Sequence, residues 1–531
     1  MSTRLSSLVL CALLAACGAA VQDRTASTLA RNGAGLYDLT VRVEKAAPGT
    51  SIGPVQAVTS VGTYSMAPAG GNDWTGQIPV ANCVNGFDVR YEATWTLLLA
   101  GNIAREPYAG VRQKWLTGPA QPGCSTVFGR LFVVNSTADL VDANPGDGVC
   151  AAGGPGAPCT LRAAVMEANA SRGQDRIELG SGTYTLTLKG NEDKAVSGDL
   201  DVLDEVAIVG TAGTVISAGE IGERVFDLSP TGDPVDLELR NLTVRDGRGP
   251  DGGGIRSRGR LHLVDVVVRD NYSRGAGAGG GIFNNDGFVE LHGSELRDNK
   301  VESDLAASGG GLQSQGASAA VFLRGSSVTG NYSGLEGGGV AILEGSLDVR
   351  DSTIADNKAR RSGGGLHLNA VVRARLRNVT ITGNQASSGN DIGAGGGIHH
   401  GAGSGSLRLA NTIVAENLGE GNVADDCNGT ITSHGFNLFG SGDGCNGIDL
   451  ARDQAGTAQS KLDPKLEALG GAPRSRTPQP GSPAIGAGNP DALNDERIER
   501  CTHVDQRGVE RPKGPLVDGR ARCDVGAVER E

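Results

Sequence analysis

The sequence predicts an all-β protein: a right-handed parallel β-helix (solenoid) with an N-terminal capping helix and a small N-terminal β-sandwich domain. The first observation behind this prediction is a run of three glycines followed by an aliphatic residue, which recurs 26 to 32 residues apart. The aliphatic residues that end these runs are Ile255, Ile282, Leu312, Val340, Leu366 and Ile398. A period in this range is typical of a solenoid, in which each repeat forms one turn.

The second observation is a phrase between successive glycine runs. It consists of an aliphatic residue, a second one five positions later and an asparagine three positions after that. The asparagines are Asn271, Asn299, Asn331, Asn357, Asn384 and Asn417. An earlier copy carries Gly247 instead. We interpret the asparagines as a structural ladder, because Asn tolerates left-handed backbone conformations and identical amides can hydrogen-bond from turn to turn. A sugar-binding groove is the alternative.

The third observation is the alternation of apolar and polar residues, as in Val289-Glu290-Leu291. A period of two predicts strands with one face directed inward. Gly, Asn, Asp and Ser cluster between these stretches, where turns are needed. One such turn cannot bury its inner face alone, whereas turns stacked about 4.8 Å apart bury it continuously.

The composition fits a chain with many turns. Of the 531 residues, 84 are glycine, and no collagen-like triplet period is present. The formal net charge is −12 at pH 7 and no basic tract occurs, which argues against nucleic acid as a partner. The length allows two or three domains, and we expect a monomer.

The N-terminal residues predict export. A basic residue precedes the apolar run Leu5–Ala16, which is too short for a permanent membrane-spanning helix, so residues 1–16 are a predicted signal peptide. Leu-Ala-Ala-Cys-Gly at 14–18 resembles a bacterial lipoprotein signal. The resemblance implies a lipid on Cys17, which would contact the membrane, and a location at the outer membrane or cell surface. Residues 17–34 would then be a tether. An ordinary cleavage site beside an unrelated cysteine is the alternative.

Eight further cysteines support export, because disulfides form in oxidising compartments. They fall into pairs that are close in sequence: Cys83 with Cys124, Cys150 with Cys159, Cys427 with Cys445, and Cys501 with Cys523. The sequence alone does not fix the connectivity. Zinc is the competing interpretation, but the spacings do not suit it and no Cys-X-X-Cys occurs.

Residues 35–124 differ in composition from the rest of the chain. The stretches Leu36–Glu44, Trp74–Val80 and Phe87–Leu99 alternate apolar and polar residues, with Pro, Gly and Asn between them. This pattern predicts a small antiparallel β-sandwich similar to the immunoglobulin fold, in which a disulfide between Cys83 and Cys124 would act as a staple.

Residues 125–232 resemble a known domain. Cys-Thr-Leu-Arg-Ala-Ala at 159–164 is similar to the Cys-Ser-Leu-Arg-Glu-Ala motif that gives the CSLREA domain its name, with departures at the second and fifth positions. Gly-Asp-Leu-Asp-Val at 198–202 also fits that family. In such proteins the domain precedes a β-helix, so the resemblance implies an N-terminal cap followed by the first turns.

The residues themselves also favour a capping helix. Thr160 can cap a short helix in which Leu161, Ala164, Val165 and Ala168 share one face. A solenoid must cover its open apolar end, and this helix is well placed to do so.

Regular turns are expected over residues 233–432. The segment 433–531 resembles the C-terminal domain called choice-of-anchor Q, through Gly-Phe-Asn-Leu at 435–438, Gly-Ser-Pro-Ala-Ile-Gly at 481–486 and Cys-Asp-Val-Gly-Ala-Val-Glu at 523–529. That name records that members are held by different surface anchors, and a lipid would be one of them. Both resemblances concern architecture more than activity.

The sequence holds only weak candidates for an active site. Polygalacturonase-like glycosidases use paired carboxylates and a Gly-His-Gly motif, and Asp425, Asp426 and His434 come nearest to this arrangement. The Asn-X-Asp and Arg-Ile-Lys partners of those enzymes do not accompany them. A turn beside a disulfide loop is the alternative, so we assign no catalytic residue.

Calcium is the one cofactor that the sequence leaves open. Asp270, Asp298 and Asp356 each precede a ladder asparagine, with an arginine beside the first two, and an aligned column could bind Ca²⁺ as in polysaccharide lyases. A solvated column of turn residues is the alternative. The loop 142–148 places its glycine one position late for an EF-hand, and His399 with its neighbouring histidine has no evident third ligand.

These observations predict a lipid-anchored surface protein without catalytic activity, in adhesion or in binding of a glycan or protein ligand. The alternative is a surface polysaccharide lyase or glycosidase of the β-helix type. The repeated phrases are also similar to those of polymorphic outer-membrane proteins, but those proteins carry a C-terminal barrel for which this sequence shows no pattern.

Overall fold

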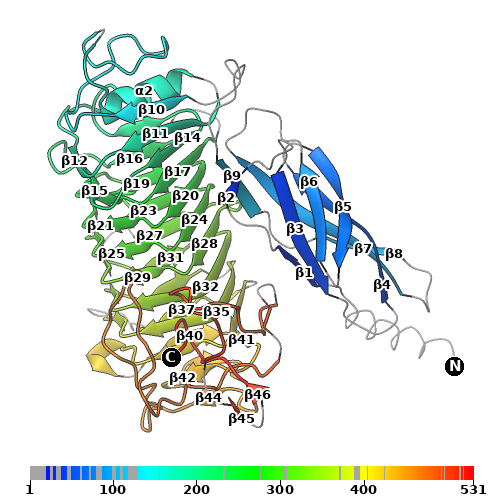
Figure 1. Ribbon diagram of the computed structural model, residues 1–531. Helices are drawn as coiled ribbons and strands as arrows, with labels where there is room; N and C mark the ends of the chain where they lie inside the picture. The colour runs from blue at the N-terminus through cyan, green and yellow to red at the C-terminus, as the bar shows by residue number, and fades with distance from the viewer. Residues whose placement is uncertain are drawn as a thin grey trace. The chain divides into compact units, whose positions relative to one another are not determined.

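The structure is a computed structural model that describes residues 130–530 together with nine strands between residues 20 and 117. Within 130–530 the description leaves out residues 155, 172, 231–233, 276, 303–307, 370–371, 388–394, 404, 424, 492, 495–496, 514–515 and 518–519. The chain divides into two compact units, Met1–Phe128 and Gly129–Glu531, which are described separately (Figure 1).

The first unit is a β-sheet whose strands pair in the order β1-β3-β6-β5-β4-β7-β9-β2, with β8 beside β7. Its strands are β1 (Ala20–Asp23), β2 (Thr28–Ala30), β3 (Tyr37–Glu44), β4 (Thr50–Thr59), β5 (Gly62–Gly70), β6 (Asp73–Ile78), β7 (Gly86–Leu97), β8 (Ile103–Pro107) and β9 (Arg112–Thr117). β2 and β9 pair in parallel, and the other described pairs are antiparallel.

Strands β3, β6 and β7 lie where the sequence alternates apolar and polar residues. Strands β1 and β2 fall within residues 17–34, where the sequence predicts a tether; they belong to the sheet because they pair with β3 and β9. The two-layer packing of an immunoglobulin-like sandwich stays a prediction. Cys17, Cys83 and Cys124 lie outside the described residues.

The second unit is a parallel β-solenoid of about nine turns (Figure 1). The large sheet contains β10 (Leu131–Val134), β11 (Asp175–Leu179), β12 (Gly182–Thr185), β14 (Val206–Val209), β15 (Thr214–Ser217), β17 (Asp236–Arg240), β18 (Thr243–Arg245), β20 (Arg260–Val264), β21 (Val267–Arg269), β24 (Phe288–His292), β25 (Glu295–Arg297), β28 (Ala320–Arg324), β29 (Ser327–Thr329), β32 (Ser346–Ala355), β35 (Arg373–Thr382), β38 (Ser406–Ala410), β39 (Ile413–Ala415), β41 (Thr432–Ser433), β42 (Leu438–Phe439) and β44 (Gln454–Ala455).

Two smaller parallel sheets complete the turns. The second sheet contains β13 (Leu200–Val202), β16 (Phe226–Leu228), β19 (Ile255–Ser257), β23 (Ile282–Asn285), β27 (Leu312–Gln315), β31 (Val340–Ile342), β34 (Leu366–Leu368), β37 (Ile398–His400), β40 (Cys427–Thr430) and β43 (Cys445–Asn446). The third sheet contains β22 (Tyr272–Ser273), β26 (Lys300–Val301), β30 (Tyr332–Ser333), β33 (Lys358–Ala359) and β36 (Gln385–Ala386). A short 3-10 helix (Glu420–Asn422) and the hairpin β45 (Leu516–Val517) and β46 (Arg520–Ala521) lie outside these sheets.

Residues at equivalent positions of successive turns stack on one another. In the large sheet Leu261 pairs with Val289, and Val289 with Val321, and all three are fully buried. In the second sheet Ile255 pairs with Ile282. Such inward columns form one hydrophobic core along the solenoid. The predicted stacking of repeats into a parallel solenoid is confirmed.

The glycine runs lead from the third sheet into the second, where successive turns approach closely. Gly252 has φ of +63°, in the left-handed region that favours glycine. A Cβ added to Gly254 would lie 2.7 Å from the carbonyl oxygen of Gly281 in the next turn. Side chains at such a position do not fit, which explains why the run recurs in each regular turn.

The six asparagines form a continuous hydrogen-bonded ladder inside the solenoid. Nδ2 of each donates to Oδ1 of the next over 2.9–3.1 Å. Asn331 also donates to the carbonyl oxygen of Leu296 and accepts the backbone N–H of Asn299. At the N-terminal end, Oδ1 of Asn271 accepts the N–H of Gly247.

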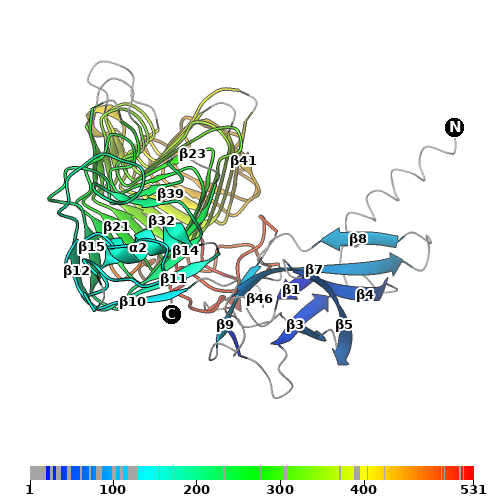
Figure 2. The same cartoon turned by 90° about the horizontal axis from the view of Figure 1, so that it is seen from above.

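Helix α2 (Leu161–Ala170), which Figure 2 shows beside β10 and β11, is the one α-helix in the part of the chain that the structure describes. It packs against β10, β11 and β13. The hydroxyl of Thr160 accepts the backbone N–H of Ala163 as N-cap. The four residues predicted to share one face, Leu161, Ala164, Val165 and Ala168, are buried.

Arg162, the arginine of the CSLREA-like motif, joins α2 to two distant segments. It is fully buried and pairs with Asp139, Nε to Oδ1, at 2.6 Å. Its guanidinium also donates to the carbonyl oxygens of Ala195, Gly198 and Asp199. Arg162 therefore holds the segment between β10 and α2 together with residues 195–199, which precede β13.

The described residues of the C-terminal segment 462–530 include several that contact the outward side of the large sheet. Thr353 donates to the side-chain oxygen of Gln506 at 2.6 Å, and the N–H of Ala527 donates to Oγ1 of Thr380 at 3.0 Å. This segment therefore belongs to the same compact unit as the solenoid. Among the described helices, none is long and apolar enough to cross a membrane.

Three of the predicted disulfides are confirmed. They join Cys150 to Cys159, Cys427 to Cys445, and Cys501 to Cys523.

Candidate anion-binding site

The outward side of the large sheet carries two columns with one residue per turn, and most of these residues are polar or aromatic. The first column is Glu238, His262, Glu290, Phe322, Asp348, Arg375 and Arg408. The second, two positions later in each strand, is Arg240, Val264, His292, Arg324, Arg350, Arg377 and Ala410. Because these positions alternate with buried aliphatic residues, their side chains point away from the core. Basic residues gather where the columns reach β32, β35 and β38.

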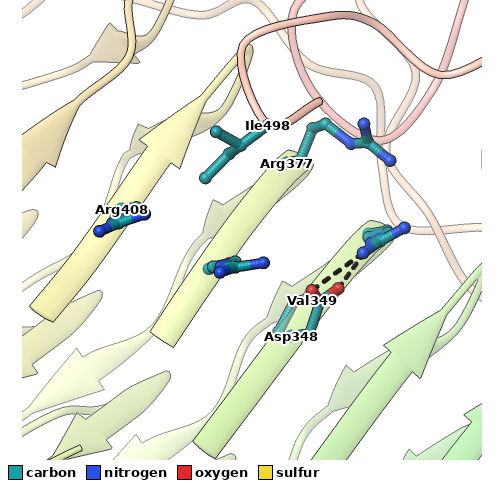
Figure 3. Close-up of a pocket in the computed structure, with 7 residues that line it drawn as sticks. Asp348, Val349, Arg377, Arg408 and Ile498 are labelled. Carbon is teal, nitrogen blue, oxygen red and sulfur yellow. Dashed lines mark hydrogen bonds and ion pairs between the residues drawn. The ribbon is translucent and has the colours of Figure 1, made fainter. Parts of the chain in front are cut away.

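A cavity of about 170 Å³ lies at this basic end. Its lining residues are Asp348, Val349, Arg350, Arg375, Arg377, Arg408 and Ile498. Figure 3 shows these side chains on adjacent parallel strands, with Ile498 contributed by the C-terminal segment that runs alongside. The cavity therefore needs both the stacked strands and the C-terminal residues.

The arginines of the cavity differ in their partners. Arg350 donates two hydrogen bonds to Asp348, at 2.6 and 3.0 Å, and so neutralises that carboxylate. Arg377 is 3% exposed and donates to two backbone carbonyl oxygens of the C-terminal segment. Arg375 and Arg408 are exposed, and neither has an acidic partner among the described residues.

Arg375 and Arg408 are direct neighbours in the sheet, so two unpaired positive charges lie one strand spacing apart. Like charges at this separation repel, and an anion placed between them replaces repulsion by attraction. The planar guanidinium presents a fork of donors that matches carboxylate, sulfate and phosphate groups. The arrangement can therefore bind an anion.

The three residues singled out by the sequence near this end have other contacts. Asp426 ends the asparagine ladder: its Oδ1 accepts both the backbone N–H and Nδ2 of Asn417, and its Oδ2 accepts the N–H of Ser441. Burial raises its pKa to about 6. Asp425 accepts the N–H of Gly395 at 2.8 Å. Both carboxylates thus bond to groups that hold the solenoid together.

His434 lies near the arginines rather than near the two aspartates. Burial lowers its pKa, and the positive charges of Arg408, Arg452 and Arg375 lower it further, while Glu499 acts in the opposite direction. Its imidazole is therefore neutral at pH 7 and adds no charge to the cavity. The carboxylate whose charge acts on the pKa of His434 is that of Glu499, not that of Asp425 or Asp426.

The column of turn aspartates is paired with arginines. Asp270 and Asp298 interact with the arginines that precede them, and Asp356 pairs with Arg476 at 2.8 Å. All three aspartates have φ of 56–57°, so each occupies the left-handed position of its turn. These carboxylates serve the turns, and they do not join into a three-ligand group among the described residues.

The loop 142–148 folds onto α2. The carboxylate of Glu167 accepts the backbone N–H groups of Gly146 and Gly148 at 2.8 and 2.9 Å. Asp142 accepts two further backbone N–H groups of the same region. The carboxylates of this loop are thus occupied by backbone donors instead of pointing at a common centre.

One group of three carboxylates has metal-like spacing, and the sequence analysis did not single it out: Asp199, Asp201 and Asp227. Arg224 donates to Asp199 and Asp227 at 2.9 and 3.0 Å, and Arg256 also binds Asp227. Two guanidinium groups thus already occupy the oxygens of Asp227, and a divalent cation beside them would be repelled. Burial raises the pKa of Asp201 to about 8 and that of Asp199 to about 6. We assign this cluster a structural role.

His399 stacks on His367 of the preceding turn, with ring centroids 5.0 Å apart. Burial lowers the pKa of both to about 4, so both rings are neutral. His400 has Nδ1 2.7 Å from the carbonyl oxygen of Thr430. Within the described residues these histidines do not form a group of three possible ligands.

Comparisons of the chain with protein-family models, with curated proteins and with solved structures gave no match. The sequence analysis missed Arg375 and Arg408, although a signal was present. Each directly precedes the first aliphatic residue of the repeated phrase, Leu376 or Leu409, so in-register stacking of the phrases places the two arginines side by side.

Proposed function

We propose that this chain is an exported, lipid-anchored bacterial surface protein whose right-handed β-helix is a non-catalytic scaffold that binds anionic groups of an extracellular glycan or protein. The observation that carries the proposal is the pair of exposed, stacked arginines, Arg375 and Arg408, beside a cavity. The lipoprotein-like signal at Cys17 supports the anchor, and the resemblances to CSLREA and choice-of-anchor Q domains support display at a surface.

In the same proposal, α2 caps the N-terminal end of the solenoid, and the strands before residue 118 form a sandwich domain between the anchor and the solenoid. The burial of the apolar face of α2 against β10, β11 and β13 supports the capping role, because an open solenoid end would expose its core.

A surface polysaccharide lyase or glycosidase is the second candidate. One observation favours it: Asp348 places a carboxylate in the same cavity as Arg375 and Arg408, and such enzymes combine acidic and basic groups in a groove. The two hydrogen bonds from Arg350 to Asp348 argue against this candidate, because they neutralise the carboxylate that catalysis would need.

The test is a binding panel on the exported chain carrying Cys17→Ser. Neutral and acidic polysaccharides of matched size are compared for retention and for product release, with and without Ca²⁺. We expect retention of acidic polymers alone, without product, and weaker retention as salt rises, because salt screens exposed charges. Equal retention of neutral polymers, or none at all, would contradict the proposal. Released product would favour the second candidate.

A further inference from the structure

The Arg-lined cavity continues into an aromatic surface on the neighbouring turns. Phe322 pairs in register with Asp348, which lines the cavity. The ring of Phe288 lies 5.1 Å from that of Phe322, centroid to centroid, and 5.5 Å from that of His262. The three rings come from strands β20, β24 and β28, which lie in this order along the stack (Figure 1).

We infer that the cavity and these rings form one strip that binds a linear acidic polysaccharide along the axis of the solenoid. This inference rests on the proposed function and names its ligand class. The strip is defined by His262, Phe288, Phe322, Arg375 and Arg408.

The charges along the strip fit such a polymer. Glu290 is paired with Arg324 at 3.1 Å, and Asp348 with Arg350, so the acidic side chains of this face are neutralised within the protein. The guanidinium of Arg324 also lies 5.6 Å from the centre of the Phe322 ring. Within the strip, Arg375 and Arg408 carry positive charge with no acidic partner among the described residues, and carboxylate or sulfate groups would bind there.

The spacing and chemistry of the rings favour a sugar chain over other polyanions. Strands repeat every 4.7–4.9 Å or so, about the length of one sugar residue, so each turn can meet one residue of a chain laid along the axis. Aromatic rings pack against the apolar C–H face of a sugar, while the arginines bind its acidic substituents. The net charge of −12 and the lack of a basic tract argue against a polynucleotide as the occupant.

The test is a length series. Oligogalacturonates from the dimer to the octamer are titrated calorimetrically into the Cys17→Ser chain and into the same chain with Phe288→Ala and Phe322→Ala. The two rings point outward and are partly exposed, so the double variant should keep the melting temperature of the parent.

We expect affinity to rise with length in the parent chain, and the ring variant to bind the octamer about tenfold more weakly while binding the dimer unchanged. Arg408→Gln should weaken both. If affinity stopped rising at the dimer, or if the ring variant bound the octamer like the parent, the strip would not be the polysaccharide-binding surface. So would tighter binding of single-stranded DNA or polyglutamate than of the octamer at equal salt. Failure of all anions, dimers included, would instead contradict the proposed function itself.

Discussion

The five ladder asparagines after Asn271 each use their full side-chain hydrogen-bonding capacity. Asn331 donates from Nδ2 to Leu296 and Asn357 and accepts with Oδ1 from the backbone and side-chain amides of Asn299. A residue that satisfies four bonds in a buried position has no equal replacement, since Asp lacks the donors and Ser lacks the reach. This explains at the residue scale why the same amino acid recurs in every regular turn.

Asn331→Ala should lower the free energy of unfolding by about 2–4 kcal/mol, because it leaves buried amide and carbonyl groups of two neighbouring turns without partners. Urea denaturation followed by circular dichroism measures the change. Asn428→Ala, at an exposed strand position, is the matched control and should change stability by less than about 0.5 kcal/mol. Equal effects of the two substitutions would show that the ladder hydrogen bonds do not stabilise the fold.

The buried carboxylate cluster predicts a pH dependence. Burial, with the nearby charge of Asp199, raises the pKa of Asp201 from 3.8 to about 8. Between about pH 4 and pH 8 the folded protein therefore holds a proton that the unfolded chain has released, so stability falls as pH rises through this window. Asp201→Asn keeps an acceptor for the N–H of Ala195 and adds a neutral donor.

Melting temperatures measured from pH 5 to pH 8.5 should therefore decline more steeply in the parent than in Asp201→Asn, with the variant the more stable near pH 8. The exposed Asp193→Asn serves as control and should follow the parent. A parent and an Asp201→Asn variant with parallel curves would show that Asp201 does not hold this proton.

At the scale of elements, the N-terminal end of the solenoid depends on contacts that the repeats do not provide. Arg162 of α2 binds Asp139 and three carbonyl oxygens of residues 195–199, while Glu167 holds the loop 142–148. In a solenoid each turn contacts only its neighbours, so damage at one end should remain local.

Arg162→Met should loosen the first turns and leave the centre intact. Hydrogen exchange followed by mass spectrometry should show faster exchange in peptides covering β10, β11 and β13 and unchanged protection in β28, β32 and β35. Arg176→Met, at a partly exposed position of β11, is the control. A uniform loss of protection along the whole solenoid would contradict the local role of this arginine.

The sequence predicts an element well where its backbone demands a specific residue. Glycine runs mark close approaches of successive turns, and asparagines mark the ladder, so the repeats and the strand positions could be read directly. Helix α2 was predictable because Thr160 and four apolar residues have helical spacing. By contrast, β1 and β2 gave no comparable signal, because two strands of four and three residues are defined only by their partners β3 and β9.

The site was harder to predict because it is formed by side chains of successive turns and by a segment that is distant in the sequence. Asp426 ends the ladder because it accepts a hydrogen bond from Asn417, 9 residues earlier in the chain. Ile498 lines the cavity because the C-terminal segment returns to the large sheet. Side-chain pairing also decides which arginines can bind a ligand. Arg350 and Arg375 look alike in the sequence, but Arg350 forms an ion pair with Asp348.

At the scale of the whole molecule, in-register stacking of the repeats places equivalent exposed residues in a row along the solenoid axis. A column with one residue per turn can present charge at one end and aromatic rings at the other, as the large sheet does between Arg408 and His262. The net charge of −12 repels a polyanion from the chain as a whole, so a local group of unpaired arginines favours binding at one place.

The most direct test of this account is the affinity of one acidic polymer, polygalacturonate, for the Cys17→Ser chain and for the same chain carrying Arg375→Gln and Arg408→Gln. Arg176→Gln, on the same side of the large sheet but at its far end, is the control. Loss of two charge-assisted contacts, each worth about 1.5–3 kcal/mol, should weaken calorimetrically measured binding at least about a hundredfold, with the control unchanged. If the double variant bound as tightly as the control, the Arg-lined cavity would not be the binding site and the central claim would be wrong.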